Sequence, residues 1–258
     1  MNRSRLRRAA AAALLAVMAA VPTMAFTEAE QYVAMGDSYA SGVGAGDYDG
    51  SDCSRSSNAY GPLLAERLGA ELVFPACGGA TIPTVYSGQM DSLSPEADLV
   101  TISVGGNDVG FSDIISTCTF SSDATCFERI EEAEADGRDR VAGELADLYA
   151  DIAAAAPNAD TVVVGYPHLF HEQACFSAFG ISAAEQERLN EGVDTINAIT
   201  AEVAAAQGFT FADPVDDFAG HGICSWTPWI KGLDFDGAYH PNASGQASGY
   251  LPAVEGAL

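Results

Sequence analysis

The stretch Gln31-Tyr-Val-Ala-Met-Gly-Asp-Ser38 joins an apolar run to a sharp turn. Four apolar residues in succession, followed by Gly36, are typical of a buried strand that ends at a turn. Ser38 would then lie at the carboxyl end of a strand, which is where open α/β sheets bind their ligands. Gly-Asp-Ser alone is weak evidence, because turns after strands use the same residue types for conformational reasons.

Two further turns carry polar side chains that complement this hydroxyl group. A second apolar run, residues 99–104, ends in Gly-Gly-Asn107, and His240-Pro241-Asn242 lies near the C-terminus before a segment that can start a helix. A hydroxyl, an amide and an imidazole, each on a turn, can serve acyl transfer as nucleophile, oxyanion donor and general base. Acyl transfer is therefore the leading hypothesis for the chemistry.

Apolar runs that alternate with helical patterns continue along the whole chain. The runs predict strands over residues 31–35, 71–74, 99–104, 161–165 and 209–212. Helices are predicted over residues 58–68, 140–156 and 183–206, and a polar excursion over residues 111–138. Ser182 and Glu185 predict a capping box at the start of the last helix. This alternation predicts a three-layer α/β/α sandwich around a parallel sheet of about five strands.

The order of these motifs resembles that of the SGNH (GDSL) hydrolase family, as does the glycine block at Cys77-Gly-Gly-Ala-Thr81. Residues 218–224 and Pro228-Trp-Ile230 make the chain similar to the secreted actinobacterial lipase and esterase branch. The resemblance implies the flavodoxin-like SGNH fold and a secreted carboxylic-ester hydrolase. Such an enzyme acts through an acyl-enzyme on Ser38 with His240 as general base. It needs no metal or cofactor, and its substrate is a lipid or another small-molecule ester.

The resemblance also implies an oxyanion hole. Its donors would be the backbone N–H groups of Ser38 and Gly79 and the side-chain amide of Asn107. Family members usually have a serine where this chain has Gly78, so the sequence leaves open which of the two glycines donates to the oxyanion. The aspartates beside Ser38 and Asn107 are expected to brace their turns rather than to react.

His240 is the preferred general base among the four histidines, which are His168, His171, His221 and His240. Pro241 fixes the next φ and Asn242 can cap a helix, so the imidazole is held at a defined corner of the chain. His240 also occupies the position of the base in the family's His-Pro motif.

The group that orients the His240 ring departs from the commonest family pattern. Many relatives have an aspartate three residues before the histidine, a position held here by Gly237, and neither Asp236 nor Asp234 matches it. Some of the secreted branch use a backbone carbonyl at that place. We therefore expect the Gly237 carbonyl to accept from the imidazole, in a dyad rather than a triad, with Asp236 as the alternative.

Two other functions remain as alternatives to the lipase or esterase hypothesis. Relatives with the same residues also act on acetylated polysaccharides, so the chain could be a carbohydrate esterase. A catalytically inactive module that binds acyl groups or glycans would be expected to lack Ser38, Asn107 or His240, and all three are present.

The N-terminus predicts a secretory signal peptide over residues 1–25. Four arginines precede an apolar run over residues 9–21, and Thr23-Met-Ala25 offers a small-x-small cleavage site. The apolar run is too short to cross a bilayer. We expect a secreted, soluble monomer with a single domain over residues 26–258 and no integral membrane segment. The export route, general secretory or twin-arginine, stays open.

The mature chain is strongly acidic. Without the four arginines of the signal peptide it has 7 basic and 36 acidic residues, a formal net charge of −29. Such a charge repels phosphate backbones, which excludes nucleic acid as an expected partner.

The six cysteines predict disulfides rather than a metal site. An even number in an exported protein implies disulfides, although the count alone leaves the pairing open. The family resemblance implies the sequential pairs Cys53–Cys77, Cys118–Cys126 and Cys175–Cys224. No C-x-x-C motif or closely spaced Cys/His set suggests a metal.

Overall fold

The computed structural model describes residues 31–171, 180–233 and 237–258. Five strands form one parallel sheet in the order β2-β1-β3-β4-β5. The strands are β1 (Gln31–Gly36), β2 (Glu71–Val73), β3 (Leu99–Ser103), β4 (Asp160–Val164) and β5 (Thr210–Ala212). The sheet order brings the ends of β2, β1 and β3 next to one another, and these ends carry most of the predicted site residues.

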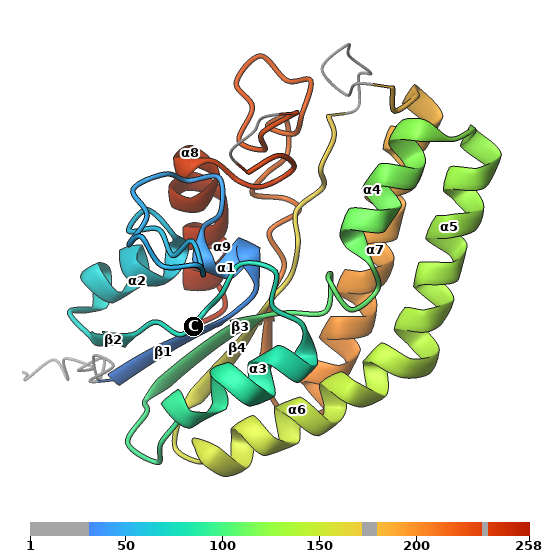
Figure 1. Cartoon of the computed structure of the whole chain (residues 1–258). Coiled ribbons are helices and arrows are strands. Elements are labelled where there is room, and N and C mark those ends of the chain that lie inside the picture. Colours follow the sequence, from blue (N-terminus) through green and yellow to red (C-terminus); the bar gives the residue numbers. More distant parts are fainter. Residues whose placement is uncertain (1–30, 172–179, 234–236) are drawn as a thin grey trace, which may run out of the picture.

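Helices cover both faces of this sheet, as Figure 1 shows. The α-helices are α1 (Ser38–Ser41), α2 (Tyr60–Leu68), α3 (Ile82–Gly88), α4 (Phe111–Phe120), α5 (Asp123–Asp136), α6 (Ala142–Ala155), α7 (Ala183–Ala206), α8 (Ala243–Gly245) and α9 (Leu251–Glu255). The described residues also include a 3₁₀-helix, η1 (Met90–Ser92), and two π-helical segments, η2 (Gly137–Val141) and η4 (Gln246–Tyr250). The predicted three-layer α/β/α architecture is confirmed.

The residues of β1 alternate between the two layers of helices. Tyr32 and Ala34 belong to the apolar core formed with α2 and α9, whereas Val33 and Met35 belong to the core formed with α3 and α6. All four are at most 1% exposed. Burial of such a side chain typically contributes about 1.5–3 kcal/mol. The strand that leads to Ser38 is therefore held from both faces.

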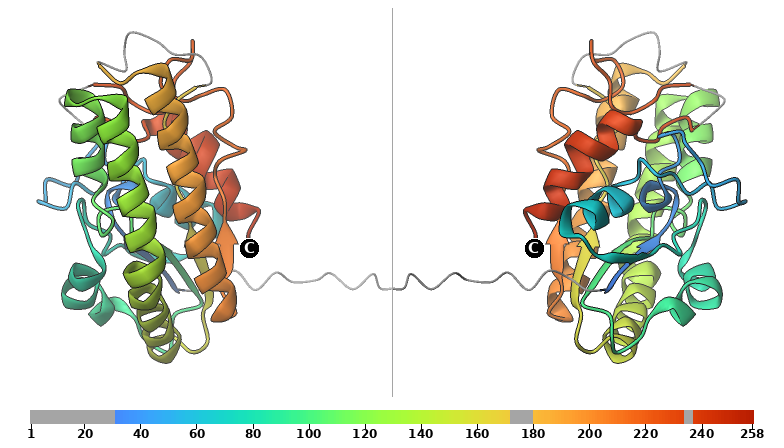
Figure 2. Two further views of the ribbon diagram at one scale, coloured as in Figure 1. Left: turned by 90° about the vertical axis from the view of Figure 1, so that its right-hand side faces the viewer. Right: turned by 90° about the vertical axis from the view of Figure 1, so that its left-hand side faces the viewer.

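The helix pair α4 and α5 replaces the polar excursion predicted over residues 111–138, so that prediction is wrong. Cys118–Cys126 joins the two helices, and Figure 2 shows them beside α7. Most of their exposed residues are polar, which hid the helical pattern in the sequence. Ile114, Ile130 and Ala133 are nevertheless buried in the core. The helix predicted from residue 140 is likewise continuous with α5, because η2 links α5 to α6 without a break.

Two of the three predicted disulfides, Cys53–Cys77 and Cys118–Cys126, are confirmed. The pair Cys175–Cys224 stays a prediction, because Cys175 lies outside the described residues. The predicted signal peptide, residues 1–25, also lies outside them. Within the described ranges, no helix combines the length and the hydropathy needed to cross a bilayer.

The predicted capping box of α7 is confirmed and should contribute measurably to stability. The Ser182 hydroxyl accepts from the Glu185 N–H at 3.2 Å, and the Glu185 carboxylate accepts from the Ser182 N–H at 2.7 Å. Ser182→Ala should lower the free energy of unfolding by about 1 kcal/mol, measured by denaturant titration. Ser182→Asn, which can still cap the helix, is the matched control. Equal stability of both variants and the native protein would contradict this role of the cap.

Candidate functional site

The turn after β1 presents Ser38 at the carboxyl edge of the sheet. Gly36 has φ 127°, and a Cβ at this position would lie 2.3 Å from the Ser103 carbonyl oxygen of the neighbouring strand. Only glycine therefore lets the chain turn so close to β3. The Asp37 N–H then donates to the same oxygen at 2.8 Å, and Ser38 begins α1.

The structure brings His240 onto Ser38, although 202 residues separate them. The His240 Nε2 and the Ser38 Oγ are 2.7 Å apart, which is hydrogen-bond distance. Ser38 is only 9% exposed. The side chain of Asn242 accepts from the Gly245 N–H and caps α8, so the predicted cap after the histidine is confirmed.

A backbone carbonyl meets the other ring nitrogen of His240, but it belongs to Ala238 rather than to Gly237. The distance from Nδ1 to the Ala238 oxygen is 2.8 Å, whereas the Gly237 oxygen accepts from the His240 backbone N–H at 3.1 Å. The prediction of Gly237 is therefore wrong by one residue. The error arises from the shape of the turn. The positive φ angles at Gly237 (86°) and Tyr239 (63°) turn the chain so that the Ala238 carbonyl, and not that of Gly237, meets the ring. Asp236, the predicted alternative, lies outside the described residues.

The Ala238 carbonyl determines which tautomer of His240 fits the site. A carbonyl oxygen only accepts, so Nδ1 must carry the hydrogen and Nε2 is left as the acceptor from the Ser38 hydroxyl. Burial lowers the pKa of His240 below its ordinary value. The hydrogen bond to Ala238 raises the pKa, but this effect is smaller than that of burial. A neutral ring in this tautomer is the form that a general base requires.

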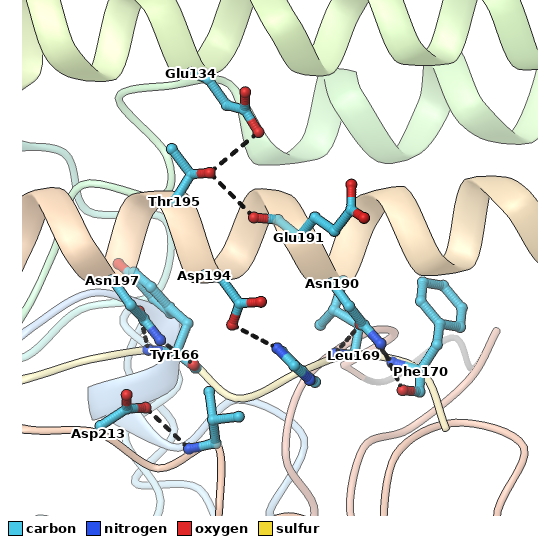
Figure 3. A network of polar contacts seen from close by, with 12 residues as sticks. Glu134, Tyr166, Leu169, Phe170, Asn190, Glu191, Asp194, Thr195, Asn197 and Asp213 are labelled. Carbon is cyan, nitrogen blue, oxygen red and sulfur yellow. Dashed lines mark hydrogen bonds and ion pairs between the residues drawn. The ribbon is translucent and has the colours of Figure 1, made fainter. Parts of the chain in front are cut away.

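Two of the other histidines have partners away from Ser38. The His168 Nε2 lies 2.7 Å from the Asp194 carboxylate, on α7 (Figure 3). The His221 ring stacks on Trp229 at a centroid distance of 3.6 Å, and its Nδ1 is 2.8 Å from the Thr227 carbonyl oxygen. The geometry thus agrees with the choice of His240.

Backbone hydrogen bonds distinguish Gly78 from Gly79, the two glycines of the block after β2. The Gly78 N–H donates to the Cys53 carbonyl at 2.9 Å. In the described part of the chain, neither the Gly79 N–H nor the Ser38 N–H has a hydrogen-bond acceptor. Gly79 also has φ 75° and open space where a Cβ would be. Gly79 is therefore the glycine of the pair whose N–H is available to a substrate.

The Asn107 amide is oriented by the same block. Its Nδ2 donates to the Ala80 carbonyl at 2.9 Å, which uses one of the two amide hydrogens and leaves the other. The neighbouring Asp108 carboxylate accepts from the Ile82 N–H at 3.0 Å, at the start of α3. The turns after β2 and β3 are thus bonded together, and β1 with Ser38 lies between their strands.

Tyr166, just after β4, is a residue of this site that the sequence did not reveal. Its hydroxyl donates to the buried Asp37 carboxylate at 2.6 Å and accepts from the Gly106 N–H at 3.1 Å. Asp37 also accepts from the Tyr39 N–H, and burial raises the pKa of Asp37 to about 7. The only feature of the sequence that pointed to Tyr166 was its position directly after a predicted strand. Tyr166 links the serine turn to the asparagine turn.

An apolar cavity opens beside Ser38 and Asn107 and extends between α4, α5 and α7. Its wall includes Tyr166 and mostly aliphatic residues of the three helices. An apolar cavity with a few polar groups at one end is typical of a small-molecule site. Over the described residues, no group of three or more His, Cys, Asp or Glu side chains is placed to hold a metal ion.

Comparisons with known proteins identify relatives of this chain. Residues 34–247 match the model of the GDSL-like Lipase/Acylhydrolase family. Lipase 1 of Streptomyces coelicolor is 42% identical over the whole of both chains. The crystal structure of phospholipase A1 from Streptomyces albidoflavus has a TM-score of 0.85 at 37% identity, covering 89% of this chain and 100% of that one.

The extracellular lipase from Streptomyces rimosus gives the same result. Its crystal structure has a TM-score of 0.85 at 40% identity, covering 88% of this chain and 99% of the lipase. The family match spans well over half of the chain, and the relatives are aligned over nearly their full length. The chain therefore belongs to the GDSL-like lipase and acylhydrolase family, the SGNH hydrolases, and is an ester-hydrolysing enzyme.

Proposed function

We propose that the protein is a secreted lipase or esterase that cleaves lipid esters through an acyl-enzyme on Ser38. The observation that carries this proposal is the 2.7 Å contact between His240 Nε2 and Ser38 Oγ beside an apolar cavity. In this mechanism Nε2 takes the hydroxyl proton as Oγ attacks the ester carbonyl, and His240 then protonates the leaving alcohol. Water activated by the same imidazole releases the acid.

The oxyanion of each tetrahedral intermediate is bound by three donors in this proposal. These are the N–H groups of Ser38 and Gly79 and the free amide hydrogen of Asn107. Removal of one such donor typically costs about 3 kcal/mol of transition-state stabilisation. Because all three donors are neutral and fixed, they stabilise the negative charge without a metal ion.

His240 and Ser38 form a dyad in this proposal, with the Ala238 carbonyl in place of a carboxylate. The carbonyl fixes the tautomer as a carboxylate would. It stabilises the imidazolium less, because it carries only a partial charge. In this dyad the catalytic rate therefore depends more on the burial of His240 and on the oxyanion donors than it would in a triad with a carboxylate.

The cavity and the relatives favour lipids over acetylated glycans as substrates. The relatives are named lipases and a phospholipase A1. An acetyl group has too little apolar surface to fill a cavity that extends between three helices, whereas an acyl chain can do so. We therefore keep acetyl-polysaccharide hydrolysis and an inactive binding module only as alternatives.

Export follows from the same proposal. Cleavage after Ala25 would release residues 26–258 as one mature domain, which we propose acts as an extracellular monomer. The two disulfides among the described residues and the extracellular Streptomyces rimosus lipase support this location.

Ser38→Ala tests the nucleophile. Nucleophile and base act as one unit, so we expect ester hydrolysis to fall by at least about 10⁴-fold, measured as kcat/KM. A fluorophosphonate should label Ser38 in the native protein and nothing in the variant. Ser87→Ala, an exposed hydroxyl on α3, is the control that should keep both activity and labelling. Substantial activity in the Ser38 variant would refute the assignment.

The pH dependence tests the base. His240 must be neutral to accept the serine proton, and burial lowers its pKa. We therefore expect kcat/KM to be constant above neutral pH and to fall with decreasing pH, with a midpoint below the ordinary histidine value of about 6.5. Burial raises the pKa of Asp37 to about 7, so the pH profile of Asp37→Asn shows whether the fall in activity comes from His240 or from Asp37. A midpoint that disappears in this variant would assign the fall in activity to Asp37 instead.

Asp236→Asn and Asp234→Asn test the dyad. The imidazole Nδ1 already has the Ala238 oxygen as partner. Each variant should therefore lose less than about tenfold in kcat, whereas loss of a true triad aspartate costs about 10⁴. A folded variant with the larger loss, checked by circular dichroism, would show that a carboxylate orients His240.

A further inference from the structure

Two glycines line the apolar cavity although nothing in their backbone requires glycine. Gly192 lies in the interior of α7, and Gly137 begins η2 with φ −56° and ψ −47°, an ordinary right-handed helical conformation. A glycine in a helix interior costs about 1 kcal/mol relative to alanine. What these positions supply is therefore the absence of a side chain.

Each glycine packs closely against an aliphatic residue of the neighbouring helix. A Cβ on Gly192 would lie 3.3 Å from Ile130 Cγ2 of α5. A Cβ on Gly137 would lie 3.2 Å from Ile199 Cδ1 of α7. All four residues line the cavity that begins at Ser38. Side chains at the two glycine positions would consequently take up space in that cavity.

Polar contacts bridge α5 and α7 beside the cavity. Thr195 Oγ1 lies 3.2 Å from Glu134 Oε1 and 3.1 Å from the Glu191 carbonyl oxygen, and its one hydrogen can be donated to either (Figure 3). Arg188 Nη1 donates to the same carboxylate oxygen at 2.7 Å. Glu134 and Arg188 are mostly buried, with side chains 14% and 17% exposed. These contacts fix the spacing of the helices, so the space left by the glycines stays available to a ligand.

Hydrogen bonds connect one part of α7 to the serine turn. Asn197 bonds both backbone groups of Tyr166, whose hydroxyl donates to Asp37 beside Ser38. Gly137 is in contact range of Ile199 and belongs to the same end. Gly192 is seven residues from Ile199, or about 10 Å along the helix. On α7, Gly192 is therefore farther than Ile199 from Asn197, the residue that bonds Tyr166.

We infer that Gly137 and Gly192 determine the acyl-chain length that the enzyme accepts, by leaving the cavity open between α5 and α7. The inference rests on the proposed function of Ser38. Long-chain acyl esters, whose chain reaches Gly192 from Ser38, are the substrate class, with the chain packed between the helices.

Gly192→Leu is the main test, with p-nitrophenyl esters from acetyl to palmitoyl. The side chain would occupy the cavity beside Ile130, away from Ser38, so kcat/KM for acetyl and butyryl esters should stay within about threefold. For decanoyl and longer esters we expect a fall of at least about tenfold, the scale on which enzymes discriminate a misfitting methylene. Gly143→Leu is the matched control, because Gly143 is a helical glycine on α6 with open space at its Cβ position.

A second pair of variants separates cavity filling from general damage. Gly192→Ala should keep the fold and show a smaller loss in the same direction. Ile130→Ala removes the aliphatic group opposite Gly192, so Gly192→Leu combined with Ile130→Ala should recover part of the long-chain activity. A loss confined to the long esters is not expected if leucine at position 192 merely destabilises α7, because such damage would lower the activity on short and long esters alike.

The outcomes distinguish the inference from the proposed function. If Gly192→Leu is labelled by fluorophosphonate at Ser38 and its chain-length profile equals that of the native enzyme, the inference is wrong and the proposed function stands. An equal loss for short and long esters, without recovery in the double variant, also overturns the inference. If the native enzyme itself is not labelled at Ser38, the proposed function fails.

Discussion

The contact between Ser38 and His240 depends on two glycines that lie back to back. Gly44 follows α1 and Gly237 precedes the histidine, and both have positive φ. A Cβ on Gly237 would lie 2.5 Å from the Cα of Gly44, and one on Gly44 would lie 3.2 Å from the Cβ of His240. Side chains at either position would push the two loops apart. Ser38 and His240 can therefore meet only because the loops that contain Gly44 and Gly237 pack against each other without side chains at these two positions.

Neutral groups surround the reaction centre of a protein with a large negative charge. The ring of His240 is held by a carbonyl, and the available donors beside Ser38 are amides. Asp37, the nearest buried carboxylate, is bonded to the Tyr166 hydroxyl and to the Tyr39 N–H. The groups that bond the His240 ring and lie beside Ser38 are therefore fixed dipoles rather than ion pairs.

Sequence patterns predicted the parts of the fold and site that depend on local chemistry. The strand before Ser38 and the cap of α7 follow from residue periodicity and side-chain capping, and both are confirmed. The choice between Gly78 and Gly79 needed the contact of Gly78 with Cys53, and the error at Gly237 came from two positive φ angles. Tyr166 and the cavity could not be predicted, because each arises from elements that only the tertiary fold brings together.

The π-helical segment η2 joins α5 and α6 into one continuous helical segment whose two parts pack in different cores. Before it, Ile130 and Ala133 of α5 pack in the core that surrounds the cavity, and after it Leu145 and Leu148 of α6 pack against the opposite face of the sheet. Each residue in an α-helix turns the chain by about 100°. An insertion or deletion of one residue here would rotate α5 relative to α6 by that angle. The packing of α6 on the sheet and the shape of the cavity beside α5 therefore depend on each other. A change of helix length at η2 would alter both the fold and the range of substrates.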